Sequence, residues 1–269
     1  MIGCIVQARM GSTRLPGKTL LKIDNEYTVL DSVINQLSFS ELIDKIVIAT
    51  TNLPSDNIIE DFVKNSNLEI FRGNSKNVLD RYFQCAKFFS FDIIIRITAD
   101  NPLIDPTIID NLINFFNLHS YDYLTNSNVR TFPYGTEVEI FTFNALEKAW
   151  NNAKKPSERE HVTPYFYNNP DLFKIFNVEN PTNISNLRWT IDRQNDLILV
   201  KTIISKIKKR PILMTDILEL FSREPKLFEI NKDQSKNEGY VKSLKEDEEY
   251  LKFKKESKKE SKKDYEKEN

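Results

Sequence analysis

The stretch GCIVQARMGSTRLPGKT, residues 3–19, decides the fold and contains the most informative candidate site. It opens with an apolar run at 3–6, which predicts a buried first β-strand. The chain then turns basic, with Arg9, Arg14 and Lys18 interleaved with glycines and small hydroxyl residues. Glycines let backbone N–H groups approach a ligand, hydroxyls add donors, and the cations neutralise negative charge. The stretch therefore predicts a phosphate-binding loop after a buried strand, rather than an ordinary basic surface turn.

The spacing within this loop argues against a P-loop nucleotide hydrolase. The Walker A pattern needs four residues between its first glycine and the closing Gly-Lys-Thr. Here five residues separate Gly11 from Gly17, and one of them, Pro16, has no backbone N–H. The loop therefore predicts phosphate binding of a different kind.

The rest of the chain alternates between strand and helix patterns. After the loop, the patterns predict strands at 45–49, 69–71 and 92–98, and helices at 29–37, 56–63, 78–89 and 107–116. Further along they predict strands at 121–124, 136–141, 173–178 and 186–191, and helices at 143–153 and 197–207. This alternation predicts an α/β fold, a doubly wound and mostly parallel sheet with ligands at the carboxyl ends of its strands.

Length, composition and charge limit the classes of function. The 269 residues are 40% hydrophobic and carry a formal net charge of −1. One α/β domain is therefore expected, and neither nucleic acid nor an anionic membrane is favoured as a partner. Cys4 and Cys85 form no zinc or disulfide pattern, and no apolar stretch is long enough to span a bilayer. We therefore expect a cytoplasmic protein.

The last part of the chain differs in composition. From about residue 232 charged residues dominate, and the end repeats lysine, glutamate and serine. Such a segment cannot bury enough apolar area to offset the entropy lost on ordering. We expect residues 232–269 to be a disordered tail or a solvated helix outside a domain at 1–231, with partner binding as the alternative.

Two carboxylates stand where predicted apolar runs end. Asp100 follows the strand at 92–98, and Asp192 follows the run at 187–191. Beside a phosphate loop such carboxylates could hold a hard cation, but each could equally cap a turn or a helix. Arg96 favours a polar site here, because a charge inside a buried strand needs a partner.

Two further candidates come from the middle of the chain. Glu137 and Glu139 alternate with apolar residues, so a strand would place both carboxylates on one face. From spacing alone this face could be either a binding surface or a solvated one. His161 is one of two histidines, and a lone histidine is more often a packed or surface residue than a catalytic one.

Three motifs resemble the sugar-activating nucleotidylyltransferases, a group that includes the cytidylyltransferases for 3-deoxy-manno-octulosonate and for sialic-acid-like sugars. The first motif is met by Gln7, Ala8, Arg9, Ser12, Arg14, Leu15, Pro16 and Lys18. The second is RITADNP at 96–102, whose Asp binds Mg²⁺ in the family, and the third is WTID at 189–192. The string REHVTP at 159–164 is similar to the SpsF-like branch, and the resemblance covers about residues 1–220.

The resemblance implies a nucleotide-diphospho-sugar transferase-like fold of the GT-A type and roles for particular residues. Nucleotide binding is implied for Gln7, Ala8, Arg9, Gly11, Ser12, Arg14, Lys18, Arg72, Gly73, Arg81, Thr98, Ala99 and Asp100. Acceptor binding is implied for Asn101, Glu137, Glu139 and His161, with an acceptor-facing and dimerisation region at 121–178. Magnesium binding is implied for Asp100 and Asp192, and catalysis for these two with Arg14 and Lys18. Asn195 replaces an acidic residue of the family pattern, which weakens a metal role for Asp196.

The function implied by the resemblance is a Mg²⁺-dependent transfer of CMP from CTP to an acidic 2-keto-3-deoxy sugar. Pyrophosphate would be released, and a homodimer would act in surface-polysaccharide or glycan synthesis. One alternative keeps the fold but uses GTP or UTP with a sugar phosphate. A second is a glycosyltransferase that uses a finished nucleotide sugar, although the strand end Asp100-Asn101-Pro102 lacks the Asp-x-Asp motif of that class. A third is a non-catalytic binding protein, which would not need both Asp100 and Asp192.

Overall fold

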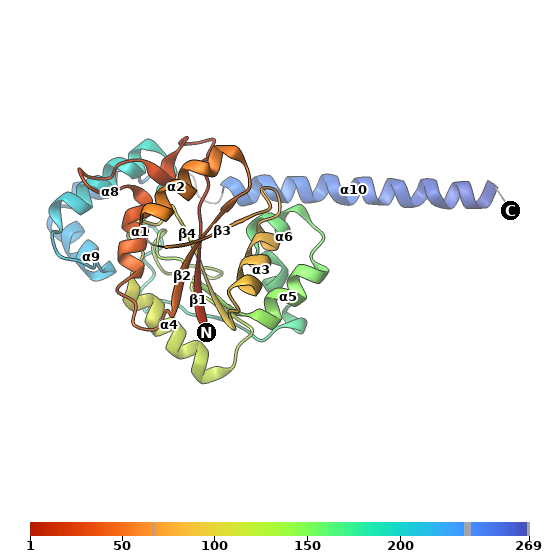
Figure 1. The fold of residues 1–269 in the computed structure, drawn as a ribbon, viewed down its shortest axis with the longest axis horizontal. Helices are drawn as coiled ribbons and strands as arrows, with labels where there is room; N and C mark the ends of the chain where they lie inside the picture. The colour runs from red at the N-terminus through yellow and green to blue at the C-terminus, as the bar shows by residue number, and fades with distance from the viewer. Residues whose placement is uncertain (67, 234–237, 268–269) are drawn as a thin grey trace.

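A seven-stranded, mostly parallel β-sheet forms the centre of the molecule (Figure 1). The computed structural model describes residues 1–66, 68–233 and 238–267. The strands are β1 (Ile2–Gln7), β2 (Lys45–Thr51), β3 (Glu69–Gly73), β4 (Ile93–Thr98), β5 (Tyr123–Thr125), β6 (Glu139–Thr142) and β7 (Ile175–Asn177). They lie in the order β3-β2-β1-β4-β6-β5-β7. The first four in this order are mutually parallel, whereas β6 runs antiparallel to β4 and β5.

Helices cover both faces of the sheet, which confirms the doubly wound prediction. They are α1 (Val29–Leu37), α2 (Asn57–Asn65), α3 (Val78–Phe88), α4 (Pro106–His119), α5 (Phe143–Asn152), α6 (Pro156–His161), α7 (Pro164–Tyr167), α8 (Gln194–Lys206), α9 (Met214–Arg223) and α10 (Glu238–Lys267). The apolar sides of α1, α2 and α4 pack on one face of the sheet, and those of α3, α5 and α7 pack on the other. The buried residues of α8 and α9 form a third apolar cluster, around Trp189 and Ile191.

The side chains of β1 show how the sheet is buried on both faces. Cys4 and Val6 are fully buried on the side of α1, α2 and α4, whereas Ile5 is fully buried on the side of α3 and α5. Side chains alternate between the two faces of a strand, so a central parallel strand is apolar throughout. Gly3 is required in β1, because a Cβ there would lie 2.2 Å from the ring of Phe91.

The predicted helix at 29–37 is present with the same bounds, as α1. Thr28 precedes it, and the Thr28 hydroxyl accepts the N–H of Asp31 at 3.2 Å. In return the Asp31 carboxylate accepts the N–H of Thr28 at 2.7 Å. This reciprocal cap satisfies two backbone donors and fixes the start of the helix.

The predicted strand at 186–191 is wrong. In this stretch Arg188 makes one isolated bridge to Tyr134, and the N–H of Ile191 then donates to the carbonyl of Asp100 at 2.8 Å. The backbone therefore pairs with two different segments in turn, and neither pairing continues into a ladder. The same hydrogen bond brings the end of this stretch beside the end of β4, where the candidate site lies.

The charged C-terminal segment forms a helix, α10, which extends away from the rest of the molecule (Figure 1). A helix was one of the two expected forms, but its first turns are packed rather than solvated. Ser243 and Asp247 are only 2% and 7% exposed, and the start of α10 contacts α6. Residues 234–237 and 268–269 of the expected tail lie outside the described residues. No helix in the described part of the chain is long and apolar enough to cross a membrane.

Candidate active site

The loop after β1 is held in place by hydrogen bonds between its backbone groups and side chains. The N–H of Met10 donates to Asp56 Oδ1 at 2.9 Å, and the hydroxyl of Thr19 donates to the carbonyl of Arg9 at 3.0 Å. The Asp56 carboxylate is buried and also accepts the hydroxyl of Thr51, so it ties the loop to the end of β2. Sequence reasoning missed this role, because Asp56 stands where an ordinary helix cap would stand.

The loop ends in a single 3₁₀ turn, η1 (Lys18–Leu20), and not in an α-helix. Gly17 precedes this turn with a φ of +68°, a left-handed conformation that favours glycine. Inside the loop, the N–H of Ser12 donates to the carbonyl of Met10 at 2.8 Å. The loop therefore presents its cations, rather than the N-terminus of a long helix, to an anionic ligand.

Lys18 joins the ends of two segments that are distant in sequence. Its ammonium donates to Asp100 Oδ2 at 2.7 Å, to Asp192 Oδ1 at 2.9 Å and to the carbonyl of Ile191 at 2.7 Å. Burial lowers the pKa of Lys18, but Asp100 and Asp192 raise it by more, so the pKa lies above its ordinary value. Lys18 is therefore charged at neutral pH and holds the two carboxylates together.

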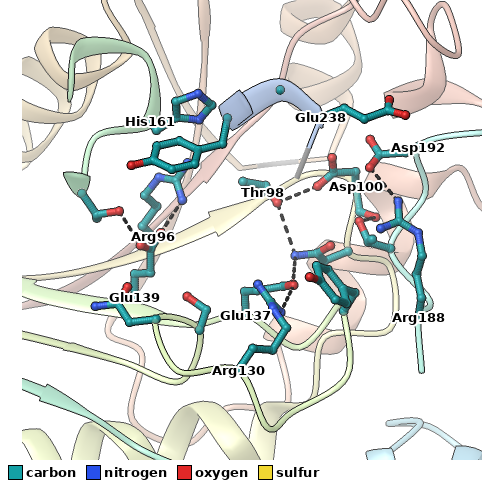
Figure 2. A pocket seen from close by; sticks show the side chains of 18 of the residues that line it. Arg96, Thr98, Asp100, Arg130, Glu137, Glu139, His161, Arg188, Asp192 and Glu238 are labelled. Atoms are coloured by element: carbon teal, nitrogen blue, oxygen red, sulfur yellow. Dashed lines mark hydrogen bonds and ion pairs between the residues drawn. The ribbon is translucent and has the colours of Figure 1, made fainter. Parts of the chain in front are cut away.

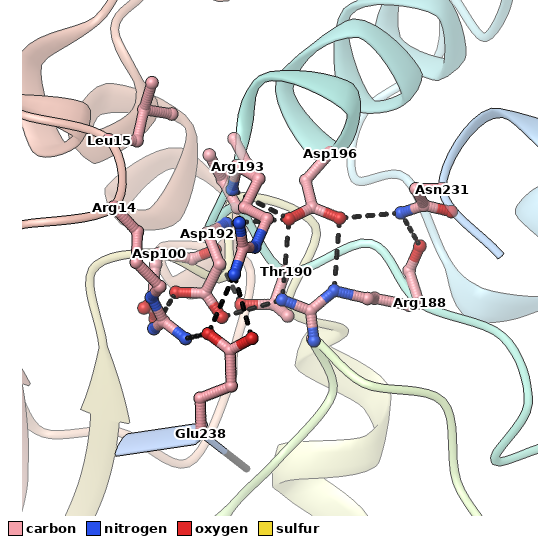
Figure 3. A network of polar contacts seen from close by, with 12 residues as sticks. Arg14, Leu15, Asp100, Arg188, Thr190, Asp192, Arg193, Asp196, Asn231 and Glu238 are labelled. Carbon is pink, nitrogen blue, oxygen red and sulfur yellow. Dashed lines mark hydrogen bonds and ion pairs between the residues drawn. The ribbon is translucent and has the colours of Figure 1, made fainter. Parts of the chain in front are cut away.

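Arg14, Lys18 and Arg188 converge on Asp192, and Figure 3 shows the two arginines beside it. Arg14 Nη2 lies 2.6 Å and Lys18 Nζ 2.9 Å from Asp192 Oδ1, and Arg188 Nη2 lies 2.7 Å from Oδ2. Burial raises the pKa of Asp192, but the charges of Lys18 and Arg14 outweigh it, so the pKa lies below its ordinary value. Asp192 is therefore an ionised carboxylate beside a basic loop.

Asp196 has a structural role four residues further on (Figure 3). Its side chain is fully buried, and Oδ2 accepts the N–H groups of Asp192 at 3.0 Å and of Arg193 at 2.9 Å. Oδ1 accepts Arg188 Nε at 3.1 Å and Asn231 Nδ2 at 2.8 Å. Asp196, and not Asp192, therefore caps α8 and fixes the segment that positions Asp192. Sequence reasoning found neither Arg188 nor Asn231, because no local pattern links them to the motif.

Two adjoining cavities open at this edge of the sheet. The loop cavity, of about 560 Å³, is lined by the predicted residues Gln7, Arg9, Gly11, Ser12, Arg14, Lys18, Thr98, Ala99 and Asp100. The glutamate cavity, of about 570 Å³, is lined by the predicted residues Asn101, Glu137, Glu139, His161, Arg14, Thr98, Asp100 and Asp192. Arg14, Thr98 and Asp100 line both cavities, so the two meet beside Lys18.

Glu137 and Glu139 line the glutamate cavity and have different partners (Figure 2). Glu139 begins β6 and forms an ion pair with Arg96 on β4, which supplies the partner that a charge inside a strand requires. Glu137 accepts Arg130 Nη1 at 2.5 Å and Asn101 Nδ2 at 3.3 Å. Both carboxylates are therefore held in place by protein groups.

Four residues with an implied nucleotide-binding role, Ala8, Arg72, Gly73 and Arg81, line neither cavity. Arg72 pairs with Glu60 and donates to carbonyls at the end of β2. Arg81 is fully buried, and a Cβ on Gly73 would lie 3.0 Å from its side chain. Arg72 and Arg81 therefore have protein partners in this structure, and nucleotide binding by the four residues stays a prediction.

The carboxylates at the meeting point of the cavities fit a magnesium ion. The described part of the chain contains no cluster of three or more histidine, cysteine, aspartate or glutamate side chains that could hold a metal. Mg²⁺, however, is usually held by one or two carboxylates together with substrate phosphates. Asp100 and Asp192 meet this requirement. Both carboxylates lie within 2.9 Å of the Lys18 ammonium, so they are close enough together to share a cation. Thr98 orients Asp100 by donating to its other oxygen at 2.6 Å.

Comparison with known proteins agrees with this geometry. A family model described as cytidylyltransferase matches residues 3–268. The chain belongs to the cytidylyltransferase family and is a nucleotidyltransferase. The match also extends over the charged C-terminal segment, which corrects the expectation that the resemblance ends near residue 220.

Particular relatives show the breadth of the match. The chain is 32% identical over 231 residues to the spore coat polysaccharide biosynthesis protein SpsF of Bacillus subtilis, covering 82% of this chain and 94% of SpsF. It is 28% identical over 176 residues to a 3-deoxy-manno-octulosonate cytidylyltransferase of Chlamydia trachomatis, covering 60% and 66% of the two chains. A solved cytidylyltransferase structure from Leptospira borgpetersenii superposes with a TM-score of 0.82 at 35% identity, covering 87% of this chain and 98% of that one.

Proposed function

We propose that the protein transfers CMP from CTP to a hydroxyl of an acidic 2-keto-3-deoxy sugar, of the octulosonate or nonulosonate type, and releases pyrophosphate. The product would serve surface-polysaccharide or glycan synthesis. The observation behind this proposal is that Lys18 joins Asp100 and Asp192 where the loop cavity meets the glutamate cavity. Family membership supports the reaction class, and the printed names of the SpsF and octulosonate relatives support the sugar-activating role.

The loop cavity suits a nucleoside triphosphate, because Arg9, Arg14 and Lys18 all line it. In the proposed reaction the acceptor oxygen attacks the α-phosphorus in line and forms a new P–O bond. The bond from the α-phosphorus to the bridging oxygen breaks, pyrophosphate leaves, and the hydroxyl proton passes to solvent water. Arg14 and Lys18 neutralise the charge on the phosphoryl group and on the leaving pyrophosphate, so positioning and electrostatics provide most of the rate enhancement.

Asp100 and Asp192 are the residues that would hold Mg²⁺. When bound, this ion would lower the pKa of the acceptor hydroxyl and neutralise charge on the phosphoryl oxygens. The chain prepares the two carboxylates for this role. Thr98 fixes one oxygen of Asp100 at 2.6 Å and Arg188 fixes one oxygen of Asp192 at 2.7 Å. The remaining oxygen of each carboxylate is the one that contacts Lys18.

The glutamate cavity contains cations that an acidic sugar could contact. Arg130 and Arg188 lie on the ring of Tyr134, with guanidinium carbons 3.9 Å and 5.8 Å from its centre. These cations could bind a sugar carboxylate. Glu137 and Asn101 face the same cavity and could bind sugar hydroxyls.

The domain organisation and the assembly state are part of the proposal. Residues 1–231 would form the main body of the nucleotidylyltransferase unit, with the first turns of α10 packed against it, and residues 121–178 would face the acceptor and form a homodimer contact. The enzyme would work in the cytoplasm, where CTP is available. Light scattering should give the mass of two chains, and the mass of one chain would contradict the dimer.

Pyrophosphate release tests the proposal. CTP, GTP, UTP and ATP are each supplied with Mg²⁺ and a panel of acidic sugars and sugar phosphates. Release with CTP and one 2-keto-3-deoxy sugar is the expected result. Release with GTP or UTP and a sugar phosphate would keep the mechanism but reject cytidylyl transfer. If the protein binds a nucleotide but releases no pyrophosphate with any combination, a binding role would be favoured. Sugar transfer from a finished nucleotide sugar would identify a glycosyltransferase.

A further inference from the structure

The first turns of α10 cover the line along which the two cavities meet. Glu238 and Gly239 line both cavities, Tyr240 lines the glutamate cavity, and Ser243 lines the loop cavity. Figure 2 shows the start of α10 running across the pocket between His161 and Glu238. No sequence motif includes this segment, and its charged composition predicted a disordered tail or a solvated helix.

Buried polar contacts hold α10 in this position. The carboxylate of Asp247 accepts the N–H of Ser157 at 2.9 Å and its hydroxyl at 2.5 Å. Ser157 lies in the first turn of α6, where backbone N–H groups have no partner within the helix. A carboxylate 90 residues away in sequence therefore caps α6. Because Asp247 is only 7% exposed, this contact is part of the folded interior.

A second group of contacts joins α10 to His161. The buried hydroxyl of Ser243 lies 2.9 Å from His161 Nε2 and 3.3 Å from Glu160 Oε2. The ring of Tyr240 meets the ring of His161 edge-on, with centres 5.3 Å apart, and burial together with the neighbouring Tyr240 raises the pKa of Tyr167. His161 and Tyr167 also line the glutamate cavity. These three side chains therefore form one continuous part of its wall.

We propose that residues 238–247 of α10 are a fixed wall of the active site, and that Tyr240 is a specificity-determining residue for the acceptor. This inference rests on the proposed function, because it places the acceptor in the glutamate cavity. The Tyr240 ring packs edge-on against His161 and lines the same cavity as Tyr167, so it limits the size of the group that the acceptor can present there.

The kinetics of pyrophosphate release test the role of Tyr240. In Tyr240→Ala we expect the KM for 3-deoxy-manno-octulosonate, or for the acidic sugar that the wild type uses, to rise about tenfold. The KM for CTP should stay within about twofold, because the ring lines only the acceptor side. The opened wall should also admit larger acidic sugars that the wild type rejects.

Tyr250→Ala is the matched control, because Tyr250 lies on the same helix and lines neither cavity. It should leave both KM values unchanged. An unchanged acceptor KM in Tyr240→Ala, or equal increases in the acceptor KM and the CTP KM, would overturn the proposal.

Hydrogen exchange tests the wall without turnover. The amides of residues 242–250 should exchange slowly in the wild type and at least about tenfold faster in Asp247→Ala. Glu246→Ala is the control, because Glu246 pairs with Lys242 on the same helix at 3.6 Å. Fast exchange in the wild type would overturn the inference even in an active enzyme.

Slow exchange without any pyrophosphate release would instead contradict the proposed function. Calorimetric binding of 3-deoxy-manno-octulosonate would then decide the role of Tyr240. Weaker binding to Tyr240→Ala than to the wild type would support the inference, and equal binding or no binding to either would overturn it.

Discussion

Asp192 and Asp196 lie close together in sequence, and substitution can separate the roles that the structure gives them. Asp192 is 15% exposed, and an asparagine there could still accept hydrogen bonds. Asp192→Asn should therefore lower the free energy of unfolding by about 1–3 kcal/mol. Asp196→Asn breaks a fully buried pair with Arg188, which should cost about 3–5 kcal/mol. The losses of kcat should have the opposite order. We expect kcat to fall about 10²–10³-fold for Asp192→Asn and about 10–100-fold for Asp196→Asn, which acts only through Asp192.

Urea unfolding, followed by the fluorescence of the buried Trp189, would measure the two stabilities, and pyrophosphate release from CTP would measure the two rates. Asp171→Asn is the control, because Asp171 is exposed and lines neither cavity. A greater loss of stability in Asp192→Asn than in Asp196→Asn would show that Asp196 is not the main structural carboxylate. A correctly folded Asp192→Asn with the kcat of the wild type would refute the catalytic role of Asp192.

Three further predictions follow from single contacts. Glu238 accepts a hydrogen bond from Arg14, which lines the loop cavity, at 3.3 Å. Glu238→Gln removes a negative charge beside this cation and should lower the calorimetric Kd for CTP about two- to fivefold, whereas Glu246→Gln should leave it unchanged. Burial lowers the pKa of His161 in the folded protein. As the pH is lowered through about 6.5, the unfolded chain therefore binds a proton before the folded protein does, and the free energy of unfolding decreases. His161→Gln should make this fall shallower in urea titrations at several pH values, and an identical slope would exclude the effect. Gly135 has a φ of +107°, and a Cβ there would lie 2.8 Å from a backbone nitrogen. Gly135→Ala should therefore lower the free energy of unfolding by about 1–3 kcal/mol. A Cβ on Gly11 would meet open space, so Gly11→Ala should change this free energy by less than about 0.5 kcal/mol in the same titration.

The sheet and the meeting of Lys18 with Asp100 could be predicted because each depends on local pattern. An apolar run that ends in polar residues marks the carboxyl end of a strand, and β1 and β4 are adjacent parallel strands whose ends share one edge. Asp192 is proposed because it follows the apolar run at 187–191, and the family motif agrees, although this stretch was wrongly predicted as a strand. The hydrogen bond from Ile191 to Asp100 brings it to the same edge without a ladder.

The contacts of α10 could not be predicted, because they depend on two buried polar side chains in a charged segment. Ser243 and Asp247 resemble their exposed neighbours in sequence, and only the fold shows that Asp247 meets the open first turn of α6. The same limit applies to Arg72. A matching motif implies that it lies near the nucleotide, which stays a prediction, whereas its pairing with Glu60 depends on the packing of α2 beside β3.

The most direct test of cytidylyl transfer follows the α-phosphate. The protein is incubated with Mg²⁺, an acidic 2-keto-3-deoxy sugar and CTP labelled at the α-phosphate, and the products are separated by anion exchange. We predict that the label moves into a new sugar-containing product while unlabelled pyrophosphate forms in equal amount. Label that stays in CTP, or that appears only as free CMP by hydrolysis, would contradict cytidylyl transfer to the sugar.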